Sequence, residues 1–157
     1  MTETFDIVII GAGFSGLYAV HKFRKKFNVV CFEAGDGVGG TWYWNRYPGA
    51  QCDTASMIYM PLLEETGFMP SKRFADGEEI QGYTRLIAEK FGFADRAIFH
   101  TQITSLVWDE DIQRWHVGTN RGDDIKARFV VMANGVLNMP KLPSIEGMEK
   151  FKGKLFH

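Results

Sequence analysis

The 157-residue sequence predicts an α/β fold, in which a parallel sheet carries helices and is joined by a small antiparallel β-meander. Two patterns predict this class. The first 34 residues read as strand, glycine-rich turn, helix and second strand, and three strand-like runs lie between residues 101 and 132. The 45% hydrophobic and 24% charged content is typical of globular domains, and a net charge of −1 gives no field that attracts nucleic acid or an anionic membrane.

The first unit has the pattern of a βαβ motif. Residues 5–10 (FDIVII) form a short apolar run, as in strands buried on both faces of a parallel sheet. Residues 15–27 predict a helix, because apolar side chains recur every three or four positions: Leu17, Val20, Phe23 and Phe27. Residues 28–32 (NVVCF) predict the second strand, which Glu33 ends.

The remaining chain supplies a long loop, one helix and the meander. Residues 35–53 show no periodicity and predict an ordered, functional loop. Asp76 and Glu79 resemble a capping box before a helix that Gly92 ends. The strand-like runs of the meander are 101–108, 114–118 and 125–132. The expected organisation is one domain over 1–139, with 93–127 as an inserted meander, and a linker over 140–157.

A glycine motif joins the first strand to the helix. Residues 11–16 (GAGFSG) spell G-x-G-x-x-G, and Glu33 follows the last glycine by 17 residues, close to the spacing of a ribose-binding acid. Gly11 permits the tight turn, Gly13 lets a pyrophosphate approach the backbone, and Gly16 lets helix and strand pack closely. Strand, turn, helix and acid together predict a Rossmann-like nucleotide site.

Residues 35–40 (GDGVGG) match the same motif but are followed by an aromatic stretch without a helical stripe. Because an anion site of this kind needs a helix N-terminus, we expect no second dinucleotide there. The acid at Glu33 would repel a 2′-phosphate, so NADP is disfavoured at the first motif, and FAD and NAD remain.

Residues 40–53 (GTWYWNRYPGAQCD) closely resemble the flavin-side loop of Baeyer–Villiger monooxygenases. Residues 129–135 (FVVMANG), followed by Pro140, are similar to the strand after the meander in flavoproteins with two dinucleotide sites, although Asn134 stands where the family often has Thr. Residues 151–157 (FKGKLFH) resemble the first part of the family fingerprint F-x-G-x-x-x-H. The resemblance covers the whole chain but only the N-terminal, FAD-binding part of the family, so the fold is expected to be incomplete.

The resemblance implies that FAD contacts four groups of residues. Those along the pyrophosphate are Gly11, Gly13, Phe14, Ser15 and Gly16. Those along the ribityl chain and ring are Thr41, Trp42 and Trp44, and Gly40 just before them is a further cofactor contact. Glu33 would bind the adenosine ribose, and the backbone of Ile103 would meet adenine. Asp53 and Tyr59 would lie near the isoalloxazine, where Asp53 supports a catalytic arginine that this sequence lacks. Plain aromatic packing at Trp42 and Trp44, and loop capping by Asp53, stay open.

In the complete family enzyme, NADPH reduces FAD, and a peroxyflavin inserts oxygen beside a ketone carbonyl to give an ester or lactone. The resemblance implies that this chain supplies the FAD-binding portion, without an NADPH domain of its own. Three alternatives stay open: a non-catalytic module that pairs its open sheet edge with a second copy or a partner chain, an N- or S-oxygenase portion, and a small NAD-dependent protein.

Other residues predict no further chemistry. Cys31 and Cys52 are too few for a disulfide scaffold and fit a reducing cytoplasm. The four histidines are scattered, so we expect no metal site. No apolar stretch is long enough to span a membrane, and a cytoplasmic protein is expected.

Overall fold

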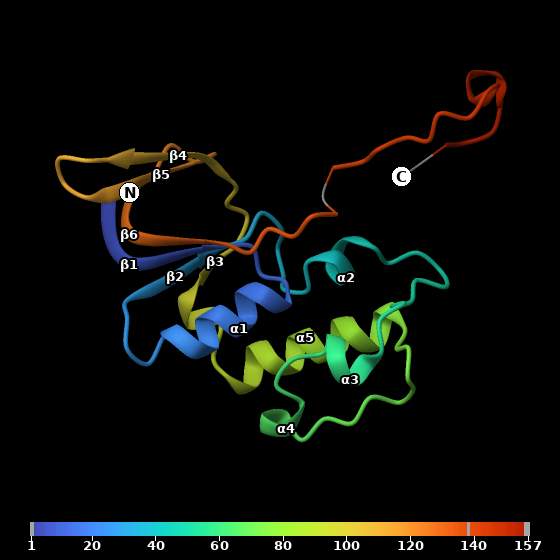
Figure 1. Ribbon diagram of the computed structural model, residues 1–157, viewed down its shortest axis with the longest axis horizontal. Coiled ribbons are helices and arrows are strands. Elements are labelled where there is room, and N and C mark those ends of the chain that lie inside the picture. The colour runs from blue at the N-terminus through green and yellow to red at the C-terminus, as the bar shows by residue number, and fades with distance from the viewer. Residues whose placement is uncertain (1, 138, 156–157) are drawn as a thin grey trace.

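The computed structural model describes residues 2–137 and 139–155 and contains a six-stranded mixed sheet in the order β3-β2-β1-β6-β5-β4 (Figure 1). Four strands run parallel: β1 (Thr2–Ile10), β2 (Val29–Phe32), β3 (Ala97–Ile98) and β6 (Asp124–Met132). The antiparallel strands are β4 (Ile103–Asp109) and β5 (Arg114–Thr119), and β5 pairs with β6. The predicted α/β class with its meander is confirmed.

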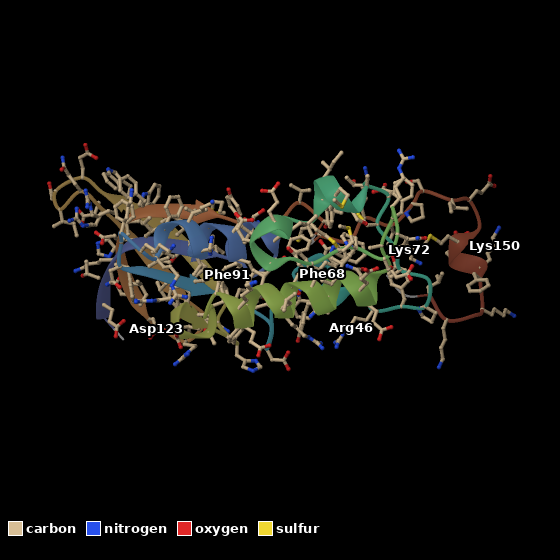
Figure 2. All side chains as sticks on the ribbon, turned by 90° about the horizontal axis from the view of Figure 1, so that it is seen from below. Arg46, Phe68, Lys72, Phe91, Asp123 and Lys150 are labelled. Atoms are coloured by element: carbon tan, nitrogen blue, oxygen red, sulfur yellow. The ribbon has the colours of Figure 1, made fainter. Side chains whose placement is uncertain are left out.

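The two long helices, α1 (Phe14–Phe23) and α5 (Gly77–Lys90), lie below the parallel strands in Figure 1. The short ones are α2 (Thr41–Trp44), α3 (Ser56–Tyr59), α4 (Leu63–Thr66), η1 (Ala94–Arg96) and η2 (Met148–Lys150). After β6 the chain leaves as an extended tail, and Figure 2 shows Lys150 on this tail at the opposite end of the molecule from Asp123. Among the described residues, no helix combines the length and apolar character needed to cross a membrane.

The alternation of β1 divides the interior into two cores. Ile7 and Ile9 belong to the core that α1 and α5 complete, whereas Val8 belongs to a second core with Val117 and Ile125 of the meander strands. Successive side chains of a strand point to opposite faces, so one buried strand serves both cores. The meander therefore covers the face of the parallel sheet that the helices leave open.

The long strands β1 and β6 connect the meander to the parallel sheet. Their parallel pairing skips one position, Asp6 opposite Arg128, where an ion pair joins Oδ1 to Nη1 at 3.4 Å. β5 pairs with β6 over residues 124–127 only, so residues 129–132 of β6 pair with β1 alone. The meander is thus an extension of the same sheet, and the second half of β6 has an open edge.

The capping box predicted at the start of α5 is wrong, although the helix is present. The Asp76 side chain caps no backbone N–H and forms an ion pair with Lys72 Nζ at 2.6 Å. Glu79 accepts hydrogen bonds from the backbone N–H and hydroxyl of Ser71, both at 2.7 Å. Residues just before this helix therefore engage both carboxylates, a competition that the four-residue pattern of a capping box does not contain.

Some boundaries also differ from the predicted ones. α1 ends at Phe23 rather than at residue 27, and β1 begins at Thr2. The loop over 35–53 contains the single turn α2, in which the N–H of Trp42 donates to the carbonyl of Gly39 at 3.1 Å. A four-residue helix is too short to produce an apolar stripe, and its glycine-rich start obscured it further.

The meander strands are joined by a histidine between two carboxylates. His116 Nδ1 lies 2.9 Å from Asp124 Oδ1, and its Nε2 lies 3.2 Å from Asp109 Oδ2. Both ring nitrogens can donate only in the imidazolium form. The hydrogen bond to Asp124, and the weaker effect of the bond to Asp109, raise the pKa of His116 above its usual 6.5. β4, β5 and β6 each contribute one member of this cluster.

We expect His116→Gln to remove a pH-dependent part of the stability. Because folding raises the pKa of His116, its contribution is fully present below the unfolded value of 6.5 and is lost as pH rises through the folded value. Urea unfolding at about pH 5.5 and about pH 8.5 should show that the stability gap between wild type and variant is larger at the acidic pH. A gap that stays constant or grows toward alkaline pH contradicts this assignment.

Candidate nucleotide-binding site

Two of the three motif glycines are required by the fold itself. Gly11 has φ +101°, and a Cβ there would lie 2.7 Å from the carbonyl oxygen of Ala133 at the end of β6. A Cβ on Gly16 would lie 1.9 Å from the carbonyl oxygen of Gly11. Gly11 therefore permits the turn and the approach of β6, and Gly16 permits the close packing of α1 on the turn, as the sequence predicted.

Gly13 differs from these two. Its φ is −75°, and a Cβ there would make an ordinary 3.5 Å contact with the Cα of Gly40. The fold therefore does not need a glycine at this position, and the missing side chain leaves the backbone accessible to a ligand. Gly13 is the N-cap of α1, whose first turn holds no acidic residue. The unpaired N–H groups and the dipole of this ten-residue helix favour an anion here.

The second glycine motif packs against the first. The N–H of Gly39 donates to the carbonyl of Ala12 at 2.9 Å. Gly40 has φ +55°, and a Cβ on it would lie 2.9 Å from the Cα of Gly13. The expectation that no helix follows this motif is wrong, because α2 begins at Thr41; it is a single turn, however, and the loop's contacts support the first turn.

The predicted ribose-binding acid lies at this junction. Glu33 is buried and accepts the N–H of Ala12 at 2.7 Å and the N–H of Gly35 at 2.8 Å. Ser15 and Thr41, predicted for the same surface, are exposed. The structure thus brings the first motif, the second motif and Glu33 together at the ends of β1 and β2.

The two loop tryptophans have different environments. Trp42 is 7% exposed, and its Nε1–H donates to the Tyr59 hydroxyl at 2.8 Å. Phe14 contacts the Tyr59 ring edge-on at 5.5 Å, and burial raises the pKa of the Tyr59 hydroxyl. Trp44 is 62% exposed and lies edge-on to Tyr43. Trp42 therefore packs in the core, which was one of the two alternatives for these tryptophans. Trp44 is available at the surface.

Asp53 and Ile103 lie on the periphery of this arrangement. Asp53 is exposed, beside a hollow of about 360 Å³ that Gln51, Cys52 and Phe74 also line. Ile103 begins β4 opposite Thr119 and packs against the second core. Neither side chain has a described contact with the glycine turn.

The cysteines and the acidic groups suggest no additional chemistry. Cys31 and Cys52 are both free and buried, and burial raises the pKa of the Cys31 thiol far above its usual range. The described part of the chain contains no cluster of His, Cys, Asp or Glu that could hold a metal ion. Of the terminal fingerprint, Phe151 and Gly153 lie in the tail, and His157 lies outside the described residues.

One supporting residue was missed from the sequence. Gln81 of α5 is buried, and its Nε2–H donates to the carbonyl of Val38 at 2.8 Å. A Cβ on Gly39 would lie 1.9 Å from Gln81 Oε1, so α5 presses directly on the second glycine loop. The available signal in the sequence was that Gln81, a polar residue, lies next to Ile80 of the apolar stripe. Its partner Val38 could not be identified, because it lies 43 positions away.

Comparisons with known proteins agree with this geometry. Residues 9–67 match the family model for an NAD(P)-binding Rossmann-like domain. Baeyer-Villiger monooxygenase 4 of Dietzia sp. (strain D5) is 48% identical over 100% of this chain and 26% of its own length. Ketocytochalasin monooxygenase of Aspergillus clavatus is 50% identical over 96% of this chain and 24% of its own length.

Solved structures show the same likeness. A steroid monooxygenase bound to NADP superposes with a TM-score of 0.82 at 43% identity, over 96% of this chain and 30% of that chain. A complex of OTEMO with FAD and NADP superposes with a TM-score of 0.87 at 34% identity, over 98% of this chain and 30% of that chain. The chain spans about a quarter of the length of these curated relatives. It is therefore a homologue, along nearly its whole length, of the N-terminal dinucleotide-binding part of the Baeyer–Villiger monooxygenases.

Proposed function

We propose that this chain binds FAD at the turn between β1 and α1. The observation that carries the proposal is Gly13: the fold leaves its backbone open at a helix N-terminus, where the diphosphate of a dinucleotide is stabilised. Glu33 lies beside it for the ribose, and Ser15 and Thr41 present hydroxyls on the same surface. The residues present fit the group, and a homologous structure holds FAD and NADP.

Within this proposal the aromatic loop forms the flavin side of the site. The Trp42–Tyr59 hydrogen bond and the Phe14–Tyr59 contact hold a rigid aromatic wall next to the turn. Trp44 and Asp53 lie exposed at the edges of this loop, available to a ligand or to a further part of the protein. Gly11 and Gly16 shape the turn, and the backbone of Ile103 is assigned to adenine.

For the protein to which this chain belongs, we propose NADPH-dependent insertion of oxygen beside a ketone carbonyl. In support, one relative is named a Baeyer-Villiger monooxygenase, and similar solved structures hold NADP. FAD, when bound, supplies the redox and oxygen chemistry, and the protein supplies position and charge. In this scheme residues 1–139 form the FAD unit, with 93–127 as its meander, and residues 140–157 lead toward the NADPH-binding part.

A Gly13→Ala variant tests the FAD site directly. The new methyl group makes only an ordinary contact in the protein but occupies the surface where the diphosphate approaches, so we expect FAD affinity to fall by at least about ten-fold. The free energy of unfolding should change by no more than about 1 kcal/mol, the scale of an N-cap substitution. Fluorescence titration with FAD measures the first quantity, and urea unfolding the second. Unchanged FAD affinity in the folded variant contradicts the site.

A second role, assembly through the sheet, is favoured by the open edge of β6. Residues 129–132 expose unpaired backbone groups together with Phe129 (54% exposed) and Met132 (61% exposed). Unpaired edges recruit strands, so this edge fits a partner strand from another chain or from another part of the same protein. Sedimentation of the chain as a clean monomer at high concentration would argue against pairing with a second copy.

A further inference from the structure

Glu33 carries a set of contacts that a ribose-binding role does not require. Glu33 is 6% exposed, and its two oxygens have different partners. Oε2 accepts the N–H of Ala12, inside the first glycine motif, at 2.7 Å. Oε1 accepts the N–H of Gly35, the first residue of the second motif, at 2.8 Å. One carboxylate therefore connects the two glycine loops.

The backbone of Glu33 is fixed as well. Its N–H donates to the carbonyl of Ile98 in β3 at 3.0 Å, and its carbonyl accepts the N–H of Thr101 at 2.9 Å. Among the described residues, no Lys, Arg or His forms an ion pair with its carboxylate. A buried carboxylate without a cation needs hydrogen-bond donors, and the two loop amides, near the positive end of α1, supply them.

The chemistry explains why an acid, and not an amide, stands here. A carboxylate offers an acceptor oxygen to each of the two N–H groups, whereas a glutamine offers one oxygen and turns an NH₂ group toward the other donor. The same two loops also approach each other closely at Gly13 and Gly40, where a Cβ on Gly40 would lie 2.9 Å from the Cα of Gly13. Glu33 and the bond from the Gly39 N–H to the Ala12 carbonyl, at 2.9 Å, thus hold the two loops together beside Gly13.

We propose that Glu33 is a positioning residue, which clamps the two glycine loops together and places the anion-binding backbone before any nucleotide arrives. Contact with a ribose hydroxyl is a second use of the same carboxylate, through lone pairs that the amides leave free. The clamp itself consists of contacts within this chain. Only its consequence for FAD affinity rests on the proposed function.

Amide hydrogen exchange of the nucleotide-free protein, followed by NMR, tests the clamp. In the wild type we expect the amides of Ala12 and Gly35 to be protected. In Glu33→Gln at least one of them should exchange about ten-fold faster or more, while the amides of Val8 and Ile9 in β1 keep their protection relative to global stability. Asp36→Asn is the matched control, because it removes a nearby exposed carboxylate whose hydrogen bond among the described residues is with the Tyr43 hydroxyl.

Each outcome decides between the two roles of Glu33. If the amides of Ala12 and Gly35 exchange in Glu33→Gln at the wild-type rates, the clamp is overturned. Absence of protection at either amide in the wild type also overturns it, and this result does not require the variant to fold. If the amides lose protection and FAD nevertheless fails to bind the wild type, the clamp stands and the proposed function fails. Loss of FAD affinity without any change in exchange assigns Glu33 to the ribose alone.

Discussion

Replacing Gly16 with alanine is expected to lower the free energy of unfolding by about 3 kcal/mol, the upper range for overpacking a well-packed site. A Cβ at this position would lie 1.9 Å from the backbone carbonyl oxygen of Gly11. That oxygen cannot swing aside as a flexible side chain would, because Gly11 is held in the turn by its N–H bond to Phe32. Helix α1 and strand β1 must therefore separate. Urea denaturation measures the loss.

Gly82→Ala is the matched control for this substitution. Gly82 also lies inside a helix, α5, but it is exposed and nothing lies within 4 Å of a Cβ built on it. Alanine should stabilise the protein there by about 0.5 to 1 kcal/mol, the ordinary difference in helix propensity. Equal effects at the two positions would mean that α1 does not pack on the turn as described.

Replacing Trp42 with alanine is expected to cost about 3 to 5 kcal/mol, as for other large aromatic side chains removed from a core. Trp42 is 7% exposed and belongs to the core that α1 and α5 complete against the parallel strands. The substitution also removes the Nε1–H donor that Tyr59 accepts at 2.8 Å. Thermal and urea unfolding measure the effect, and Trp42→Phe separates lost volume from the lost hydrogen bond.

Trp44→Ala provides the internal control two positions along the same loop. Trp44 is 62% exposed, so its removal should change stability by no more than about 0.5 kcal/mol. If Trp44→Ala destabilises the protein as much as Trp42→Ala, the assignment of one tryptophan to the core and the other to the surface is incorrect.

The βαβ unit and its glycine motif could be predicted from the sequence because both depend on local patterns. The apolar run of β1, the stripe of α1 and the requirements for Gly11 and Gly16 depend on residues within one short unit, where periodicity and backbone conformation follow from the residue types. Glu33 could be selected by its spacing from the motif. The pair of loop amides that bond its carboxylate could not be predicted in this way. The bond from Gly35 is local, but the bond from Ala12 spans 21 positions.

Features that depend on contacts outside the local pattern were missed or assigned incorrectly. Asp76 had the spacing of a cap, yet Lys72 takes its carboxylate. Gln81 looked like an ordinary helix residue, although it supports Val38 across 43 positions. The continuity of β6 with β1 makes the meander part of the main sheet, and no local pattern encodes which strand will lie beside which.

The identity of the bound nucleotide tests the FAD site at the first glycine turn most directly. The chain, purified and dialysed, is examined by absorption spectroscopy before and after addition of FAD, and the bound nucleotide is then released and identified. If the turn between β1 and α1 binds FAD, flavin absorption bands appear and FAD is the released nucleotide, at about one per chain with one glycine turn. A colourless protein that retains NAD but takes up no FAD would contradict it.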